Sequence, residues 1–333
     1  MKKRVFISLI LAAAMALTLG ACGQKKEEQK VEAVVDGVTV EGEDSLAVAG
    51  ESIDIGGLAL RPEGQVGQIH EYDGMKLVVP LEYDALVTVE TGKGELLFSV
   101  SETESIQAAE AKGYNGDGAG FLFGIDRVSR DELNAMRCQD MSGMDVIAAD
   151  DGDICYICVH PTDVRVERMG DLNEADLTTW TELNEWAAGA ARESFIAENG
   201  LTALTYGNSE PETALARAAY DSEAVYTVST LEFGPLEPAG VDAAPFVERL
   251  TANCRMEYCD EEAPDGEYAV LRFPEEDVRY DFFFAEGFEN YIRKVSADGE
   301  EWLFKAVYAD GTTKASAVME EWYQAIAQAN GKA

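Results

Sequence analysis

The sequence predicts an α+β protein of two small units, each a mixed sheet with helices, after a signal peptide and a flexible tether. Short stretches of alternating apolar residues, typical of half-buried strands, are interspersed with stretches whose apolar residues recur at helical spacing. Apolar residues make up 47% of the 333 residues, as in a globular protein that can bury a core. The order of elements in residues 74–207 is partly echoed in residues 208–333.

The first 21 residues have the pattern of an export signal. A basic start at residues 2–4 precedes an apolar run over residues 5–19, which is shorter than the roughly 20 residues that a bilayer-spanning helix needs. The run ends in Leu19-Gly20-Ala21-Cys22, which resembles the lipobox of bacterial lipoproteins. The resemblance implies cleavage by signal peptidase II, fatty acids such as palmitate carried on Cys22, and anchoring at the outer face of the cytoplasmic membrane. An ordinary signal peptide with a coincidental cysteine is the alternative.

Two segments without a strong pattern follow the lipobox. Residues 22–35 carry the lipidated cysteine and a polar, charged stretch that cannot bury enough apolar area to order itself, so we expect a tether. Residues 36–73 are rich in glycine with short valine and isoleucine alternations, which predict a weakly structured arm.

The first unit, residues 74–207, combines short strands with three helices. Alternation predicts strands over residues 75–81, 86–91, 95–101, 120–128, 153–160 and 163–168.

Each helix carries its own boundary signals. The helix over 103–112 ends at Gly113 and is expected to be capped by Ser101 or Thr103. Ser129 stands three residues before Glu132, so a capping box starts the helix over 130–138.

A long amphipathic helix is expected over residues 176–198, ending at Asn199-Gly200. Its predicted buried face comprises Trp180, Leu183, Trp186, Ala187, Ala190 and Ala191.

The second unit, residues 208–333, repeats the ending of the first. Residues 268–274 and 277–280 echo residues 156–161 and 163–166, each pair being a strand, a proline turn and a segment that opens on Asp-Val-Arg. Each unit also closes with a tryptophan-bearing helix that ends in Asn-Gly. Duplication and chance similarity both remain open.

The charge is strongly acidic, with 26 basic against 63 acidic residues and a net charge of −37. Such a body repels phosphate backbones and anionic lipid surfaces, which argues against nucleic acid as a partner. Solubility outside the cell and attraction of cations or a basic partner are the two interpretations.

Five cysteines remain after Cys22, and an odd number cannot pair fully within one chain. Cys155 and Cys158 have redox spacing but lie in a predicted strand, whose alternation sends them to opposite faces. We therefore expect two separate buried thiols. Pairing between Cys254 and Cys259 is left open, and Cys138 has no evident partner.

No catalytic, cofactor or metal motif stands out in the body. Residues 115–118 (Asn-Gly-Asp-Gly) predict a turn, because the first and last ligands of a calcium loop are missing. His70 and His160 are the only histidines. His160 stands near Asp163 at a strand end, and we interpret it as structural before catalytic.

The densest aromatic stretch, residues 281–291, is the possible binding site. In a strand Phe282 and Phe284 share one face while Phe283 takes the other, so burial on both faces is the alternative to a groove for a peptide or glycan. The possible contact residues are Phe282, Phe284, Phe288 and Tyr291, together with His160 and Asp163.

Residues 121–128 and 160–163 also resemble uncharacterised lipoproteins of anaerobic Gram-positive gut bacteria, a resemblance that implies no activity. The favoured hypothesis is a lipid-anchored extracytoplasmic binding or interaction protein that meets a peptide, a glycan, a cation or a cell-surface protein. The alternatives are an extracytoplasmic hydrolase using carboxylates or His160, and a structural envelope lipoprotein.

Overall fold

A computed structural model shows that the chain belongs to the predicted α+β class. It describes the backbone of residues 31–35, 38–42, 53–54, 58–60 and 66, and the backbone and side chains of residues 67–116, 118–163, 165–166, 174–230 and 234–332. The lipobox and Cys22 lie outside the described residues.

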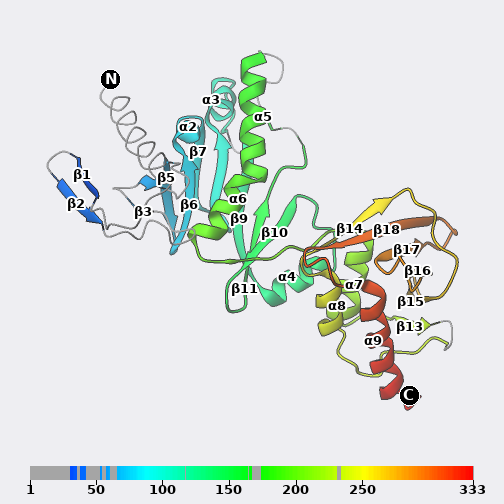
Figure 1. The fold of residues 1–333 in the computed structure, drawn as a ribbon. Helices are drawn as coiled ribbons and strands as arrows, with labels where there is room; N and C mark the ends of the chain where they lie inside the picture. The colour runs from blue at the N-terminus through cyan, green and yellow to red at the C-terminus, as the bar shows by residue number, and fades with distance from the viewer. Residues whose placement is uncertain are drawn as a thin grey trace. The chain divides into compact units, whose positions relative to one another are not determined.

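The chain forms two compact units that are interleaved in sequence (Figure 1). The first comprises Met1–Lys93, Leu97–Leu122 and Arg165–Gly200, and the second comprises Gly94–Leu96, Phe123–Val164 and Leu201–Ala333. The predicted division at residue 208 does not coincide with the bounds of these two units. The difference arises from tertiary packing, because helix α4 (Arg130–Arg137) packs against helix α7 (Glu210–Tyr220) of the later segment.

Among its described residues, the first unit holds two small antiparallel sheets, two further strands that are neighbours in a sheet, and four helices. Strand β1 falls inside the predicted tether, where Val31, Ala33 and Val35 alternate as a strand requires. The sheets are β1 (Val31–Val35) with β2 (Val38–Gly42), and β3 (Ile53–Asp54), β4 (Leu58–Leu60), β5 (Val66–Tyr72) and β6 (Met75–Pro80) in that order. The remaining elements are α2 (Leu81–Asp84), β7 (Val87–Lys93), nearly all of β8 (Leu96–Glu102), α3 (Thr103–Ala111), α5 (Glu174–Ala188) and α6 (Ala190–Glu198).

The predicted long helix is two helices, α5 and α6. They meet at Gly189, whose φ of −120° and ψ of −91° are not helical. The break turns the apolar face, so Ala190 is exposed, although the other five predicted face residues are buried. The Asn199 side chain then accepts from the Lys76 N–H and donates to the Lys76 carbonyl, both at 2.8 Å, which fastens the end of α6 to β6.

Of the two predicted helix N-caps, one is present and the other is not. Ser129 and Glu132 form the expected capping box at the start of α4. The N-cap of α3 is Glu102, without a side-chain cap bond, so the prediction of Ser101 or Thr103 is wrong. The Thr103 hydroxyl instead lies 3.0 Å from that of Thr88, because the end of β8 brings it to β7.

The second unit begins with antiparallel strands in the order β12-β10-β11-β9. Their bounds are β9 (Phe121–Ser129), β10 (Met144–Ala149), β11 (Ile154–Val159) and β12 (Thr202–Ala203). Leu133, Met141, Val146, Cys155 and Ile157 form a small core between these strands and α4.

The strand expected over residues 163–168 is absent among its described residues, Asp163, Arg165 and Val166. The Arg165 carbonyl accepts from the Gly120 N–H at 2.7 Å, which ties this segment to a turn rather than to a strand partner. The first copy of the predicted repeat therefore lacks the second strand that the later copy has.

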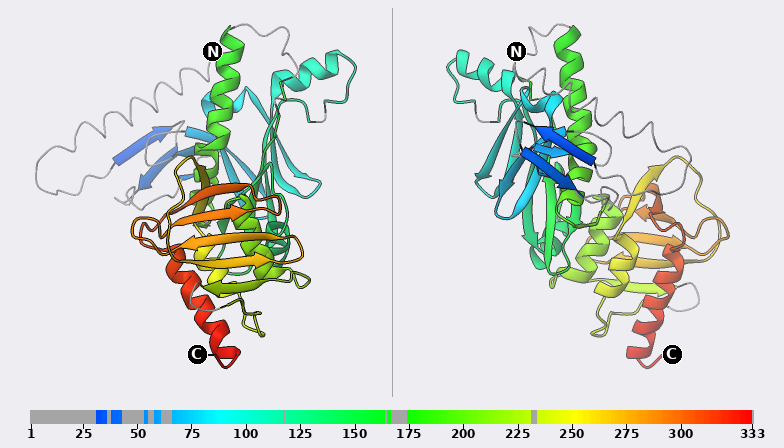
Figure 2. Two further views of the ribbon diagram at one scale, coloured as in Figure 1. Left: turned by 90° about the vertical axis from the view of Figure 1, so that its right-hand side faces the viewer. Right: turned by 60° about the vertical axis from the view of Figure 1, so that its left-hand side comes forward.

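The rest of the second unit is an antiparallel sheet in the order β13-β15-β16-β17-β18-β14, packed against helices (Figures 1 and 2). Trp322 is fully buried at the centre of its core, stacked on Phe246 at 6.0 Å and 5.8 Å from the ring of Tyr226. The strands are β13 (Thr227–Thr230), β14 (Cys254–Cys259), β15 (Tyr268–Phe273), β16 (Val278–Phe283), β17 (Tyr291–Val295) and β18 (Glu301–Tyr308). The helices are α7 (Glu210–Tyr220), α8 (Ala244–Thr251) and α9 (Ala315–Ala329).

Candidate binding face

The sheet β13–β18 in the second unit has two different faces. Its inner face contributes Leu271, Phe282, Ile292 and Phe304 to the core beneath α7, α8 and α9. The alternate residues point to the opposite side, here called the outer face, which none of the described helices of this unit covers (Figure 2). The outer face comprises Tyr268, Val270, Arg272, Arg279, Asp281, Phe283, Tyr291, Arg293, Leu303 and Lys305.

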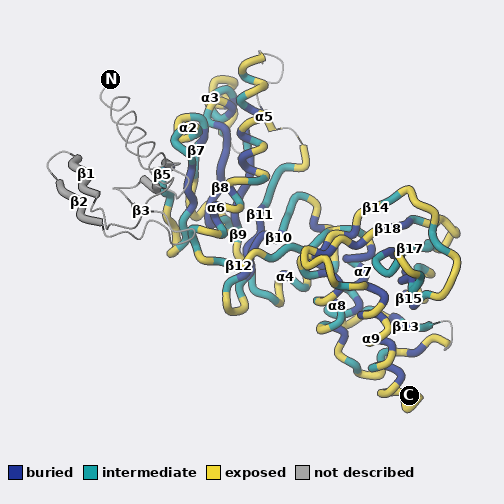
Figure 3. The backbone as a smooth tube through the Cα atoms, viewed as in Figure 1, coloured by how far each residue is buried: buried dark blue, intermediate teal, exposed yellow. Residues whose placement is uncertain are grey.

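The predicted aromatic site is divided between the two faces. Phe282 is fully buried in the inner core, and the half-buried Phe284 packs against that core. Phe283 is buried as well, on the outer side, so the strand is buried on both faces. Figure 3 maps burial along the described chain. Phe288 and Tyr291 lie with Phe283 on the outer side.

A small aromatic cluster forms one end of the outer face. The ring centroids of Tyr268 and Phe283 are 5.9 Å apart, and those of Phe288 and Tyr291 are 4.8 Å apart. Tyr268 and Phe288 are only half-buried, so their rings remain partly accessible. The Tyr291 hydroxyl donates to Glu261 at 2.9 Å, and the Lys305 ammonium lies 5.0 Å from the Tyr291 ring centroid. The cluster therefore carries polar groups at its edge.

Beside this cluster lies a fully buried carboxylate, that of Asp281. Arg293 donates to its Oδ2 from Nε at 2.9 Å and from Nη2 at 2.7 Å. Arg279 Nε lies 3.2 Å from Oδ1 as an ion pair, although neither of these atoms forms a hydrogen bond within the described residues. Burial raises the pKa of Asp281, and the Arg293 and Arg279 guanidiniums offset part of that rise.

The Arg293 guanidinium connects the buried carboxylate to the aromatic cluster. Its Cζ lies 5.5 Å from the ring centroid of Tyr268 and 5.4 Å from that of Phe283. Glu301 adds a second ion pair at 3.5 Å. Because cation–π contact and ion pairing hold it from two sides, Arg293 is fixed in one orientation.

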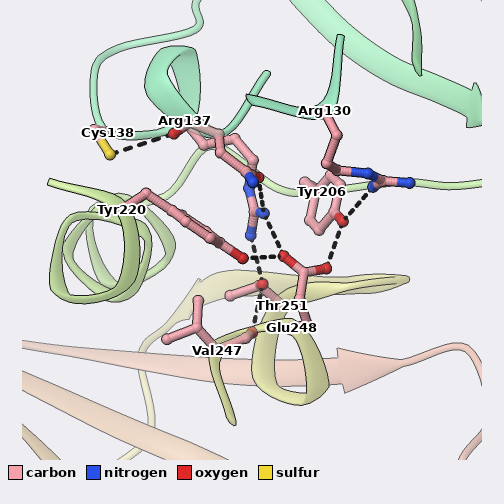
Figure 4. A network of polar contacts seen from close by, with 9 residues as sticks. Arg130, Arg137, Cys138, Tyr206, Tyr220, Val247, Glu248 and Thr251 are labelled. Carbon is pink, nitrogen blue, oxygen red and sulfur yellow. Dashed lines mark hydrogen bonds and ion pairs between the residues drawn. The ribbon is translucent and has the colours of Figure 1, made fainter. Parts of the chain in front are cut away.

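A second polar network in the same unit joins α4 to α7 and α8 (Figure 4). Arg137 donates to Glu248 Oε1 at 2.8 Å and to the Thr251 hydroxyl at 2.6 Å. Glu248 also accepts from Tyr206 at 2.6 Å and from Tyr220 at 2.5 Å. Burial would raise the pKa of Glu248, but the Arg137 charge and these hydrogen bonds outweigh it and lower that pKa. All donors and acceptors belong to elements of one unit, so we assign this network to stability.

The other two predicted site residues, His160 and Asp163, do not belong to any strand of the sheet β13–β18. His160 follows β11, where its Nε2 lies 3.3 Å from Asp145 and its Nδ1 lies 3.3 Å from the Pro161 carbonyl. Asp163 is exposed. The Asp145 carboxylate orients the imidazole, and among the described residues no hydroxyl or thiol is hydrogen-bonded to His160 to act as a nucleophile.

The five described cysteines are free thiols. Cys155 and Cys158 are both fully buried, as predicted, and burial raises the pKa of Cys155. Cys254 and Cys259 occupy the two ends of β14. Burial raises the pKa of Cys254 to about 12, so this thiol is not a nucleophile at neutral pH.

Within the described part of the chain, no three histidine, cysteine or acidic residues are grouped to hold a metal ion. None of the helices described is both long enough and apolar enough to cross a bilayer. No protein-family model, curated protein or solved structure matches this chain.

The sequence interpretation identified the aromatic residues of the outer face but missed its charges. A usable signal was present, because Arg279, Asp281 and Phe283 alternate with Tyr280 and Phe282. An aspartate at that position must lie on the face opposite the core. Its partner Arg293 is 12 residues away on the next strand, and no local pattern connects the two.

Proposed function

We propose that this chain is a lipid-anchored, extracytoplasmic binding protein and that the outer face of the sheet β13–β18 is its contact surface for a peptide or glycan. The observation that carries the proposal is the fully buried Asp281 on a face that none of the described helices of this unit covers. Burying an ion pair is costly, and replacing it with apolar residues often stabilises a protein. The buried ion pair is explained if the site must hold charged groups in fixed positions for a ligand.

The composition of the outer face fits this proposal. Half-buried Tyr268 and Phe288 offer apolar ring surface, while Arg279 and Lys305 offer charged groups beside it. Binding sites commonly combine aromatic surface with a few oriented polar groups. The lipobox at residues 19–22 supports the location, since a lipid on Cys22 would keep the body outside the membrane.

A thermal-shift screen tests the proposed function. The mature chain, with Cys22→Ser to keep it free of lipid, is screened against peptides, sugars and envelope fragments. A ligand that binds only the folded state raises Tm with the logarithm of its concentration. We expect a dose-dependent rise that is lost in Tyr268→Ala and Phe288→Ala.

Tyr114→Ala is the matched control, because Tyr114 is an aromatic residue of the other unit that is 65% exposed. A rise that persists in both outer-face variants, or that Tyr114→Ala also removes, would contradict the assignment of this face.

A further inference from the structure

Two arginines stand directly opposite one another on adjacent strands of the outer face. Arg272 of β15 and Arg279 of β16 are cross-strand partners, and their side chains are 52% and 40% exposed. Like charges in this position destabilise a sheet. In a chain with only 26 basic residues among 333, this pair requires a physical explanation.

The hydrogen-bond donors of these two arginines are largely unused. Arg272 donates from Nη2 to Asp277 at 2.7 Å. Arg279 faces Asp281 Oδ1 at 3.2 Å, yet its Nε is buried and makes no hydrogen bond to any described residue. Arg293, in contrast, donates from both Nε and Nη2 to the same carboxylate. Among the described residues, the two Nη groups of the half-exposed Arg279 and the Nε and Nη1 groups of Arg272 therefore have no hydrogen-bond partner, while all three nitrogens of Arg293 are paired.

Asp281 explains how Arg279 is held outward. Its carboxylate lies beneath the arginine, fully buried, and is itself fixed by Arg293. Each of the three arginines has an acidic partner: Asp277 for Arg272, Asp281 for Arg279 and Glu301 for Arg293. Selectivity for a ligand here therefore comes from directed N–H donors rather than from excess positive charge.

Planar guanidinium groups bind carboxylate and phosphate oxygens through paired N–H donors. Two such groups on neighbouring strands, with Cβ atoms about 5 Å apart, can share one oxyanion between them. A bound oxyanion also removes the repulsion between the two positive charges. We propose that Arg272 and Arg279 together form an oxyanion site that binds a carboxylate or phosphate group of the ligand. This inference rests on the proposed function of the outer face and names the chemistry of its ligand.

The test is an NMR titration of the lipid-free mature chain (Cys22→Ser) that follows the Nε–Hε signals of the arginines. Inorganic phosphate is added in one series and acetate in another, each against sodium chloride at matched ionic strength. We expect saturable shifts of the Arg272 and Arg279 signals with at least one of the two anions. The anion that saturates identifies the group as phosphate or carboxylate.

Variants make the assignment specific. Arg279→Gln and Arg272→Gln should each weaken the apparent affinity by about tenfold or more, because each removes one half of the site. Arg279→Lys keeps the charge without the planar fork and should lose affinity as well. Arg249→Gln is the matched control, since Arg249 is 50% exposed and paired with Glu321 on α9. It should leave the affinity unchanged.

Shifts that grow linearly and match those from chloride would overturn the oxyanion site, as would full affinity in both glutamine variants. That failure is distinct from failure of the proposed function. A thermal shift that depends on Tyr268 and Phe288 would still support the outer face as a contact surface, with a ligand that carries no oxyanion there.

Discussion

The guanidinium carbon of Arg137 lies 3.6 Å from the ring centroid of Tyr206, whose hydroxyl donates to the same carboxylate, Glu248, that Arg137 binds. The three residues therefore form a closed triangle of cation–π contact, hydrogen bond and ion pair (Figure 4). Arg137 is 5% exposed, so its charge has little access to water. The triangle joins α4 to a segment that follows it by more than 60 residues.

Replacing Arg137 should strongly destabilise the protein. Arg137→Met removes the ion pair and leaves the Glu248 carboxylate without its charge partner, at a cost of roughly 2–4 kcal/mol. Urea unfolding measures this cost. The control is Arg249→Met, which breaks an exposed pair and should cost about 1 kcal/mol or less. Equal losses in the two variants would contradict the role assigned to Arg137.

The two tyrosines should each contribute through Glu248. Tyr206→Phe and Tyr220→Phe each remove one hydrogen bond to a charged acceptor, with an expected loss of roughly 1–2 kcal/mol. A double-mutant cycle with Glu248→Gln tests the coupling, since the tyrosine losses should shrink when the carboxylate is gone. Strictly additive losses would show that the hydroxyls act independently of Glu248.

The network also predicts a dependence of stability on pH. The folded-state pKa of Glu248 lies below its ordinary value of 4.5, so the carboxylate stabilises the folded state above about pH 4.5. This contribution is lost as the pH falls through the lower, folded-state pKa. The free energy of unfolding of wild type and Glu248→Gln, measured between pH 7 and pH 3, should converge at the acidic end. A difference that stays constant would rule out this linkage.

Gly120 should tolerate no side chain. Its φ is +65°, and a Cβ there would lie 2.7 Å from Ser105 Cβ and 2.8 Å from the Glu102 carbonyl oxygen. Gly120→Ala should therefore cost the left-handed strain of about 1–2 kcal/mol plus about 1–3 kcal/mol of overpacking. Gly118 has a similar φ of +76° with nothing within 4 Å, so Gly118→Ala should cost the strain alone. Thermal unfolding separates the two variants, and equal Tm values would contradict the steric argument.

Cys22 should carry the lipid. Cys22→Ser in the full chain should abolish incorporation of labelled fatty acid and release the body from the membrane fraction. A serine at Cys138, a half-buried thiol in the body, provides the control and should leave labelling unchanged. Labelling that survives Cys22→Ser would show that the lipobox resemblance is coincidental.

Local patterns predicted strands β6 to β9, β11, β15 and β16 and the start of α4, because these depend on alternation and capping. Residues 75–81 and 268–274 were expected as strands and are strands β6 and β15 within one residue at each end. The Ser129–Glu132 capping box is present for the same reason. Strand β10 was not predicted, and Gly189 divides a helix whose periodicity continues through it.

The polar networks could not be predicted in this way. Arg137 is 111 residues from Glu248 and 114 from Thr251, and only the packing of α4 on α7 brings these residues together. The bounds of the two units differ from the predicted division for the same reason, since contacts between distant segments decide which residues belong together. The aromatic residues at 282–291 were predicted as one possible binding site, and their distribution between two faces depends on where the helices pack.

The interleaving of the units has a consequence for how the polypeptide matures. The first unit cannot be complete until residue 200 has been synthesised, and the second needs both residues 123–164 and the C-terminal end. A fragment that begins at residue 208 would contain Glu248 and Tyr220 without the arginine that they surround. The first unit can therefore form once residue 200 has been delivered, whereas the second must wait for the segment after residue 200, and a single cut after residue 200 would separate that segment from residues 123–164 of the same unit.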